Sequence, residues 1–257
     1  AKLLNNYLIA LRGVFALAGR DIKLDNPMEG IENSKHQAVP PDPLSTAEME
    51  QILTSMRKHY DVRAWAYFEF AFMTGMRPEE LIELRWGDID WQTETARVQR
   101  ARTGGEVKVL KTSIVRDVDL VKRAVAALEV MKAWTQVGSL DEIDKELGRK
   151  IFQSPVTDRA WHDERSQRDT FWRPTLRRLG IRWRRPYQTR HTYAANNLSA
   201  QVNPTYIARQ MGHTNARMLF TVYGKWIDGA DRGREKAKME AMLKKGDESP
   251  ANLPRSL

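Results

Sequence analysis

The stretch RRPYQTRHTYAANNL, from Arg184 to Leu198, combines an arginine with a tyrosine and a histidine close to it in sequence. The residues from Thr189 to Ser199 predict a helix that carries Arg190 at its start. Tyr187 stands three residues before Arg190, and His191 follows it directly. One residue along an α-helix turns the side-chain direction by about 100°, so His191 is expected to point away from Arg190.

A second arginine lies between two predicted helices. The pattern Ser45-x-x-Glu48 is a capping box and predicts the start of a helix. The apolar run AWAYFEFAFMT predicts the next helix, which ends at Gly75, and Pro78 suits the first turn of the following one. Arg77 is therefore fixed between a helix end and a helix start.

Three valine-rich stretches between residues 95 and 120 alternate in polarity, which is typical of strands: TARVQRA, EVKVL and SIVRDVDL. The turns are RTGG and, at Lys111 to Ser113, KTS. Helical spacing predicts further helices at Val121–Thr135, Gln167–Leu179, Thr205–Met211, Ala216–Tyr223 and Gly233–Lys245. The predicted fold is mainly α with a small antiparallel three-stranded sheet, an α+β class.

A proline-rich segment, residues 37–45, predicts a linker between two parts of the chain. Residues 1–36 contain one helical pattern, and we expect them to be the end of an earlier domain. Residues 46–228 form the main domain, and residues 229–257 a C-terminal helix and a disordered tail. The chain begins without Met, so we expect it to be part of a longer protein.

The composition favours a polyanionic partner. The 257 residues include 42 Lys and Arg against 33 Asp and Glu, a net charge of +9, and no cysteine. The absence of cysteine excludes disulfides, thiol catalysis and zinc fingers, while the positive charge favours nucleic acid. No stretch reaches the roughly 18 apolar residues of a membrane span, and no paired carboxylates suggest a magnesium site. We therefore expect neither membrane association, nor a metal, nor a cofactor.

Five motifs follow one another along the chain: TGMRPEEL around Arg77, LKTS around Lys111, PYQTRHT around Arg190, MGHTN around His213 and VYGKW around Tyr223. In this order and spacing they resemble the tyrosine recombinase family, also called phage integrases, over residues 44–228. The resemblance implies that residues 46–228 are the catalytic domain and residues 1–36 the end of a core DNA-binding domain. It also implies cleavage and rejoining of duplex DNA through a covalent 3′-phosphotyrosyl intermediate.

The chemistry explains why such residue types occur together. A tyrosine hydroxyl can attack phosphorus, but its pKa of about 10 requires a base or a positive field. Two arginines can hold the non-bridging oxygens with planar, bidentate hydrogen bonds. The leaving 5′-oxygen needs a proton donor. By resemblance, Tyr223 is the nucleophile, Arg77 and Arg190 hold the phosphate, and Lys111 is the proton donor, with Lys108 as the rival.

Three further positions take their roles from the resemblance. His213 matches a histidine that hydrogen-bonds the phosphate and helps the tyrosine lose its proton, and Glu80 matches an acidic position that braces the arginines. The family pattern His-x-x-Arg has Tyr187 in place of the histidine. A tyrosine can donate a hydrogen bond to phosphate but is a poor base near neutral pH. We expect Tyr187 to keep a role in positioning the phosphate. The alternative is that its presence in place of histidine impairs catalysis.

The run RWRRP supplies candidates for contacts with the DNA backbone: Arg182, Arg184 and Arg185. The alternative is a solvated run of charge. Each site residue has an equally ordinary structural explanation when taken alone: Arg77 as a cap for the preceding helix, for example, or Tyr223 as part of an amphipathic face. The conjunction of five motifs favours the active site.

The resemblance also implies partners. We expect double-stranded DNA with specific attachment sites, a homotetramer on synapsed DNA, a monomer without DNA, and accessory DNA-bending proteins. The setting would be a bacterial cytoplasm, with the protein encoded by a prophage or genomic island. The alternatives are a type IB topoisomerase and a non-catalytic DNA-binding protein on the same scaffold. The positive charge alone also fits a basic RNA-binding or membrane-surface protein.

Overall fold

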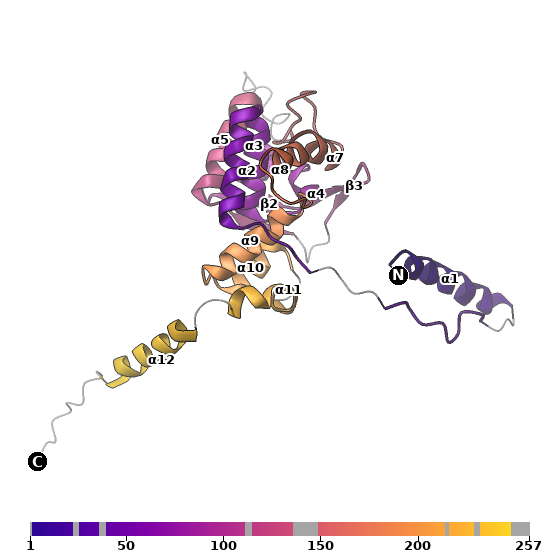
Figure 1. Cartoon of the computed structure of the whole chain (residues 1–257). Helices are drawn as coiled ribbons and strands as arrows, with labels where there is room; N and C mark the ends of the chain where they lie inside the picture. Colours follow the sequence, from indigo (N-terminus) through magenta and orange to yellow (C-terminus); the bar gives the residue numbers. More distant parts are fainter. Residues whose placement is uncertain are drawn as a thin grey trace, which may run out of the picture. The chain divides into compact units, whose positions relative to one another are not determined.

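The computed structural model describes residues 2–22, 26–35, 40–110, 115–135, 149–213, 216–228 and 232–247. It divides the chain into two units, residues 1–40 and 41–257, within the proline-rich segment (Figure 1). None of the helices in these ranges is both long enough and apolar enough to cross a membrane.

The first unit is built on helix α1, Lys2–Asp21. The segment after it returns along the helix, because Asn5 Nδ2 donates to the carbonyl of Ser34 and the Ser34 N–H donates to Asn5 Oδ1, both at 2.8 Å. Large apolar side chains of α1 remain exposed, including Leu4, Tyr7 and Val14.

The second unit is organised around helix α3, Val62–Thr74, in which nearly every side chain is buried. Helix α2, Thr46–His59, begins with the predicted capping box: Ser45 Oγ accepts from the Glu48 N–H and the Glu48 carboxylate accepts from the Ser45 N–H. Helices α2, α5 (Lys122–Thr135) and α9 (Gln188–Ser199) all pack against α3.

The end of α3 requires glycine. Gly75 has a φ of 61°, and a Cβ at this position would lie 2.5 Å from Cδ1 of Tyr193 on α9. The short helix α4, Pro78–Leu81, follows, and the chain continues through the 3-10 turn Trp86–Asp88. Arg77 thus lies between α3 and α4, as the sequence predicts.

The strands form two sheets instead of one. Strands β1 (Ile89–Asp90), β2 (Thr95–Val98) and β5 (Arg116–Asp119) form a three-stranded antiparallel sheet in the order β1-β2-β5. Strands β3 (Arg100–Thr103) and β4 (Glu106–Val109) form a separate antiparallel hairpin. The mainly helical fold with a small three-stranded antiparallel sheet is confirmed. Two of its strands, β2 and β5, lie in predicted stretches, whereas β1 was not predicted and the predicted strand EVKVL forms β4 of the hairpin.

The division of the strands into two sheets has a local cause at each end of the TARVQRA stretch. Gly104 and Gly105 both have positive φ, 60° and 84°, and such a two-residue turn pairs the strands that directly flank it. Ala96 and Val98 bury their side chains and pair with β5, where Ala96 lies opposite Val118. The stretch therefore divides at Gln99 and serves two sheets.

The predicted helix 167–179 contains a change of register. It comprises α7 (Arg165–Gln167), a π-helical turn (Arg168–Trp172) and α8 (Arg173–Arg178). Proline has no N–H and its ring crowds the carbonyl four residues earlier, so Pro174 at the start of α8 accounts for the wider turn before it.

The last helices form a small core of their own. Helices α10 (Pro204–Met211) and α11 (Ala216–Asp228) pack with α9, and α12 spans Arg232–Asp247. The small core consists of Ala194, Leu198, Ile207, Met211, Leu219 and Tyr223.

We predict that Gly75→Ala destabilises the protein more than Gly180→Ala. Both glycines have left-handed φ, 61° and 65°, so each substitution costs about 1–2 kcal/mol of backbone strain. Only at Gly75 does the new methyl group meet a ring, that of Tyr193, which adds about 1–3 kcal/mol of overpacking. Urea unfolding of both variants measures the difference, and equal losses would show that the ring moves aside freely.

Candidate active site

Arg77 is held by the helix that it precedes. Its N–H donates to Glu80 Oε2 and its Nη1 donates to Glu80 Oε1, both at 2.9 Å. A third of the Arg77 side chain remains exposed (33%). Burial lowers the pKa of Arg77, but the Glu80 carboxylate, with a smaller contribution from Tyr187, outweighs it and leaves the pKa above its usual value.

The Glu80 carboxylate is buried and is shared with a second arginine. Arg116 on β5 donates from Nη2 to Glu80 Oε2 at 2.7 Å and from Nη1 to Oε1 at 3.1 Å. Burial raises the pKa of Glu80. The hydrogen bonds and charge of Arg116, together with the charges of Arg77 and Arg190, lower the pKa by more, so the net shift is downward. The carboxylate is therefore ionised and joins the two arginines.

Arg116 was missed in the sequence, although a signal was present. Residues 116, 118 and 120 share one face of the strand, and Arg116, Val118 and Leu120 are all buried. An arginine at such a position requires a partner for its charge. Its Nε also donates to the carbonyl of Gln210 on α10 at 2.7 Å.

Arg190 is buried at the start of α9 and joins two helix ends. Its Nη1 donates to the carbonyl of Gly75 at 2.7 Å and its Nη2 to that of Met211 at 2.6 Å. Both carbonyls lie at helix C-termini, whose partial negative charge favours a guanidinium. Burial, followed by the charge of Arg77, lowers the pKa of Arg190 to about 10, so the group stays charged at neutral pH.

A pocket of about 540 Å³ opens between α4, the β3–β4 hairpin and the α10–α11 region. The residues that line it include Arg77, Glu80, Thr103, Tyr187, His213 and Met218. Arg190 contacts the backbone two residues before Arg77 and two residues before His213. Five predicted site residues thus lie together, four at the pocket and Arg190 behind it, although they come from positions 77 to 213.

His213 follows the left-handed Gly212 that ends α10. A Cβ on Gly212 would lie 2.6 Å from Nη1 of Arg116, so glycine permits the close approach. The Nδ1 atom of His213 is buried and has no hydrogen-bond partner among the residues that the structure describes. Burial, followed by the charge of Arg190, lowers the pKa of His213 to about 4, so the ring is neutral at pH 7.

Tyr223 and His191 are in direct contact, which the sequence argument did not anticipate. Tyr223 lies on α11 with only 2% of its surface exposed, and His191 Nδ1 is 2.5 Å from its hydroxyl oxygen. His191 was expected only to point away from Arg190; the packing of α11 against α9 places Tyr223 on the face that His191 occupies. Burial raises the pKa of Tyr223, while burial and the nearby Arg190 lower the pKa of His191 to about 4.

Tyr187 lies between the pocket and these two residues. Its side chain lines the pocket, and its ring meets that of His191 edge to face at a centroid distance of 5.3 Å. The ring of His191 lies 5.6 Å from that of Tyr223. Three rings therefore lead from the pocket to the buried tyrosine.

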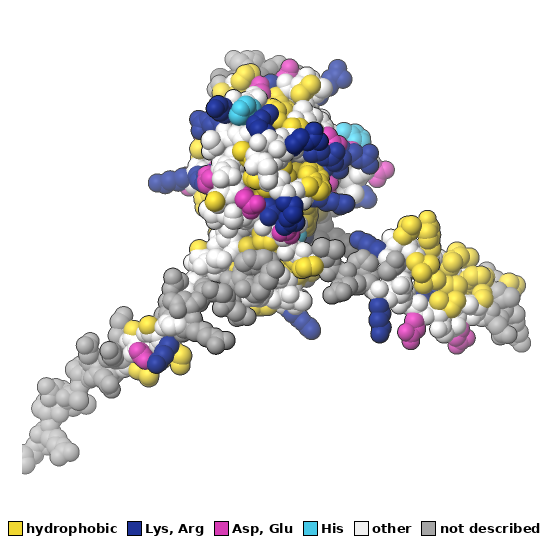
Figure 2. All heavy atoms as spheres, in the orientation of Figure 1, with side chains coloured by type: hydrophobic (Ala, Val, Ile, Leu, Met, Phe, Trp, Pro, Cys, Tyr) yellow, Lys and Arg dark blue, Asp and Glu magenta, His cyan; other side chains and the backbone are white. Residues whose placement is uncertain are grey.

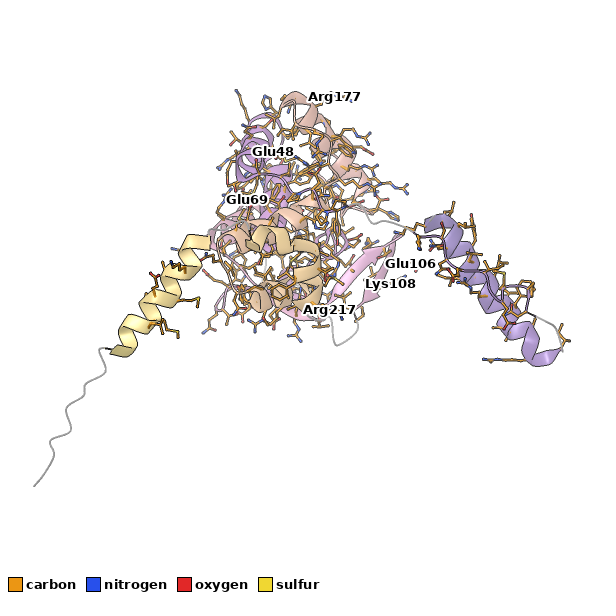
Figure 3. All side chains as sticks on the ribbon, turned by 60° about the horizontal axis from the view of Figure 1, so that its bottom comes forward. Glu48, Glu69, Glu106, Lys108, Arg177 and Arg217 are labelled. Carbon is orange, nitrogen blue, oxygen red and sulfur yellow. The ribbon has the colours of Figure 1, made fainter. Side chains whose placement is uncertain are left out.

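The candidate proton donors lie on or after the β3–β4 hairpin. Lys111 is outside the described residues. Lys108 on β4 is opposite Ala101, which lines the pocket, and directly paired antiparallel residues project from the same face (Figure 3). Lys108 therefore stays a rival to Lys111.

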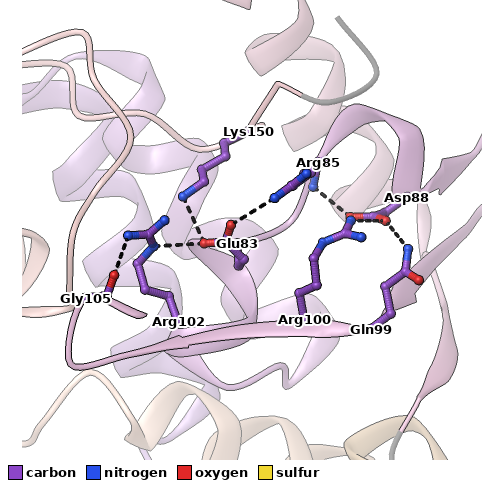
Figure 4. A network of polar contacts seen from close by, with 8 residues as sticks. All are labelled: Glu83, Arg85, Asp88, Gln99, Arg100, Arg102, Gly105 and Lys150. Atoms are coloured by element: carbon purple, nitrogen blue, oxygen red, sulfur yellow. Dashed lines mark hydrogen bonds and ion pairs between the residues drawn. The ribbon is translucent and has the colours of Figure 1, made fainter. Parts of the chain in front are cut away.

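Two buried carboxylates fasten the other face of this hairpin (Figure 4). Glu83 accepts from Nε of Arg102 and from Nζ of Lys150, both at 2.9 Å. Burial raises the pKa of Glu83, but Lys150 and Arg102 together lower it below its usual value. Asp88 accepts from Nη2 of Arg100 at 2.5 Å.

The basic run RWRRP is partly occupied by structural contacts. Arg184 Nη1 donates to Glu48 Oε1 at 2.7 Å and its Nε to Asp42 Oδ2 at 3.2 Å, so this side chain holds the start of α2. Arg182 also pairs with Asp42, at 2.6 Å, but its side chain is 66% exposed. Arg185 is exposed. Of the three, Arg182 and Arg185 remain DNA-contact candidates. Within the described ranges no cluster of three or more His, Asp or Glu could hold a metal ion.

Comparisons with known proteins assign this chain to one family. The phage integrase family matches residues 43–226, and the chain belongs to this family of tyrosine recombinases. It is 35% identical over 244 residues to the putative defective protein IntQ of Escherichia coli K12, covering 88% of this chain and 61% of IntQ. It is 31% identical over 242 residues to the prophage integrase IntR of the same strain, covering 88% of this chain and 58% of IntR.

The chain thus spans about three fifths of the length of both relatives, 61% and 58%. Solved structures share its fold. The Tn1549 transposon integrase in complex with circular intermediate DNA has a TM-score of 0.71 at 20% identity, covering 94% of this chain and 80% of that one. A lambda integrase tetramer bound to a Holliday junction has a TM-score of 0.57 at 16% identity, covering 80% and 56%.

We predict that Glu80→Gln destabilises the protein by about 3–5 kcal/mol at pH 7, because Arg116 then lacks its buried counter-charge. The folded pKa of Glu80 is lowered, so its contribution is present above the unfolded pKa of about 4.5 and is lost as pH falls through the folded pKa. The difference between wild type and variant should therefore shrink in acid.

Urea unfolding at several pH values between 7 and 3 measures this difference. Glu106→Gln on the exposed strand β4 is the matched control and should unfold like the wild type at every pH. A gap between wild type and Glu80→Gln that stays constant into acid would contradict the assignment of an ionised Glu80.

Proposed function

We propose that this chain carries the catalytic domain of a site-specific DNA recombinase that cuts and rejoins duplex DNA through a 3′-phosphotyrosyl intermediate. The observation that carries the proposal is the convergence of Arg77, Tyr187 and His213 on one pocket, with Arg190 bonded to the backbone behind it. Such a pocket suits a phosphate diester, because the arginines offer planar donors to its non-bridging oxygens.

The proposed reaction has four parts. Arg77 and Arg190 hold the scissile phosphate and stabilise the charge of the transition state. The hydroxyl of Tyr223 attacks the phosphorus, and the 5′-oxygen leaves with a proton from Lys111 or Lys108. His213, which is neutral, hydrogen-bonds the phosphate. Rejoining reverses these steps and needs neither a metal nor a cofactor.

The charge of the chain supports a duplex DNA partner. The net charge is +9, and Lys and Arg side chains (dark blue) lie across the visible face of the second unit in Figure 2. Exposed arginines of this unit include Arg165, Arg173 and Arg182, with side-chain exposures of 78%, 49% and 66%. Their contacts with phosphates would make binding strongly salt-dependent.

The structures of relatives support a DNA partner and assembly on DNA. The Tn1549 and lambda integrase structures hold DNA, the latter as a tetramer on a Holliday junction. We propose specific attachment sites, a tetramer on synapsed DNA and a monomer without DNA, with accessory DNA-bending proteins. Helix α12 exposes Met239, Met242 and Leu243, which suit docking on a neighbouring subunit. IntR is a prophage integrase, and we propose integration and excision of a phage or genomic island in a bacterial cytoplasm.

We predict that the protein forms a covalent adduct with a nicked duplex that carries the junction between the mobile element and the host DNA. We also predict that Tyr223→Phe abolishes the adduct. The reason is that Tyr223 is the proposed nucleophile, and phenylalanine lacks the hydroxyl that would form the bond to phosphorus. A denaturing gel in EDTA measures the adduct. An adduct that persists in Tyr223→Phe would refute the nucleophile, and binding without any adduct would favour the non-catalytic DNA-binding alternative. Repeated relaxation of supercoiled DNA without strand exchange would favour the topoisomerase.

We predict that Tyr187→Phe slows adduct formation about 10- to 100-fold, since a hydrogen bond to a charged group contributes about 1.5–3 kcal/mol. Tyr187→His, which restores a donor at the family position, should recover most of the rate. Single-turnover kinetics on the same nicked duplex measure both variants. A Tyr187→Phe rate equal to wild type would show that the hydroxyl has no role in holding the phosphate.

A further inference from the structure

The resemblance gives His213 a part in deprotonating Tyr223, but the structure places a different histidine against the Tyr223 hydroxyl. The proposed attack needs an acceptor for the hydroxyl proton of Tyr223, and the family position for a histidine holds Tyr187, which is a poor base. His213 lines the pocket, while Tyr223 is buried on α11. The imidazole of His191 lies against the reacting oxygen itself, with Nδ1 2.5 Å from it.

We infer that His191 is the proton acceptor for Tyr223, and that this role has moved one helical turn from position 187 to position 191. The inference rests on the recombinase function proposed above. It also rests on two observations: the direct contact of Nδ1 with the hydroxyl, and the ring contacts that place His191 between Tyr187 and Tyr223.

The bond between Tyr223 Oη and phosphorus forms while the bond between phosphorus and the 5′-oxygen breaks. The hydroxyl proton of Tyr223 passes to Nδ1 of His191, and the lysine donor, Lys111 or Lys108, gives its proton to the 5′-oxygen. During rejoining the 5′-oxygen forms its bond to phosphorus and gives its proton back to the lysine, while the bond between phosphorus and Tyr223 Oη breaks and the imidazolium returns its proton to that oxygen.

The surroundings of His191 set the pH range of this role. The groups that face it are Arg190 and Tyr187 at the start of α9, Tyr223 on α11 and His213 after α10. Burial first, and then Arg190, lower the pKa of His191 to about 4, so the ring is neutral at pH 7 and its proton affinity must rise when DNA binds. A bound phosphate brings negative charge to Arg190, which weakens the repulsion of the imidazolium that forms.

The test uses the full chain and nicked duplexes that differ at one atom, with either oxygen or sulfur bridging to the 5′-carbon. A thiolate leaves without a proton donor but still requires deprotonation of the tyrosine. We expect His191→Ala to lose at least 100-fold of the single-turnover adduct rate at pH 7 on both duplexes, within the range of general-base catalysis, about 10²–10⁴. Variants of the lysine donor, Lys111 or Lys108, should instead form the adduct slowly on the oxygen duplex and recover their rate on the sulfur duplex.

Three further readouts separate chemistry from positioning. The wild-type rate should be flat from pH 6.5 upward, whereas the His191→Ala rate should rise with pH as hydroxide replaces the imidazole. Added imidazole should partly restore His191→Ala. His191→Asn keeps a hydrogen-bond acceptor without a base and should be as slow as His191→Ala. His162→Ala, an exposed histidine elsewhere, is the control and should match the wild type.

Two outcomes would overturn the inference. Wild-type rates in His191→Asn would show that His191 only positions the hydroxyl, and a faster reaction in His191→Ala would show that it restrains the tyrosine at rest. Fluorescence anisotropy of DNA binding establishes that each variant is folded, and His191→Asn replaces His191→Ala if the latter does not bind. Failure of the wild type itself to form an adduct would instead refute the proposed function.

Discussion

The buried carboxylate of Glu80 is the constraint on which the site depends. Arg77, Arg116 and Arg190 lie close enough to influence its pKa, and no such group of cations could be buried without a counter-charge. Because Glu80 binds Arg77 from the same helical turn and Arg116 from β5, one side chain fixes the register between α4 and the sheet. Its own ionisation depends on these partners in return.

Backbone carbonyls complete the framework. Arg190 binds the ends of α3 and α10 through Gly75 and Met211, and Arg116 binds Gln210 one residue earlier. The large core around α3 and the small core around α10 and α11 are thus joined by guanidinium groups at helix C-termini. These bonds orient the guanidinium planes before a phosphate arrives, which is how preorganised donors lower a transition-state barrier.

Local signals were predictable from the sequence and long-range contacts were not. The capping box at Ser45, the left-handed Gly75 and the position of Arg77 follow from residues within one turn of each other. The contact of His191 with Tyr223 spans 32 positions and depends on the packing of α11 against α9, which a helical-wheel argument cannot supply. The split of the strands at Gln99 likewise depends on which partner buries Val98.

The burial of Tyr223 has an energetic consequence for the reaction. Helix α11 buries Leu219 and Tyr223, one turn apart, in the small core, while its Met218 and Phe220 are exposed. Exposing two such side chains costs roughly 3–6 kcal/mol, far less than opening the large core. A shift of α11 that carries the hydroxyl past His191 to the pocket is therefore within the range that DNA binding can offset. Tyr187 and His191 both lie at the start of α9 and would not move with α11. The hydroxyl of Tyr223 would therefore pass His191, the proposed proton acceptor, and Tyr187, which is proposed to hold the phosphate, on its way to the pocket.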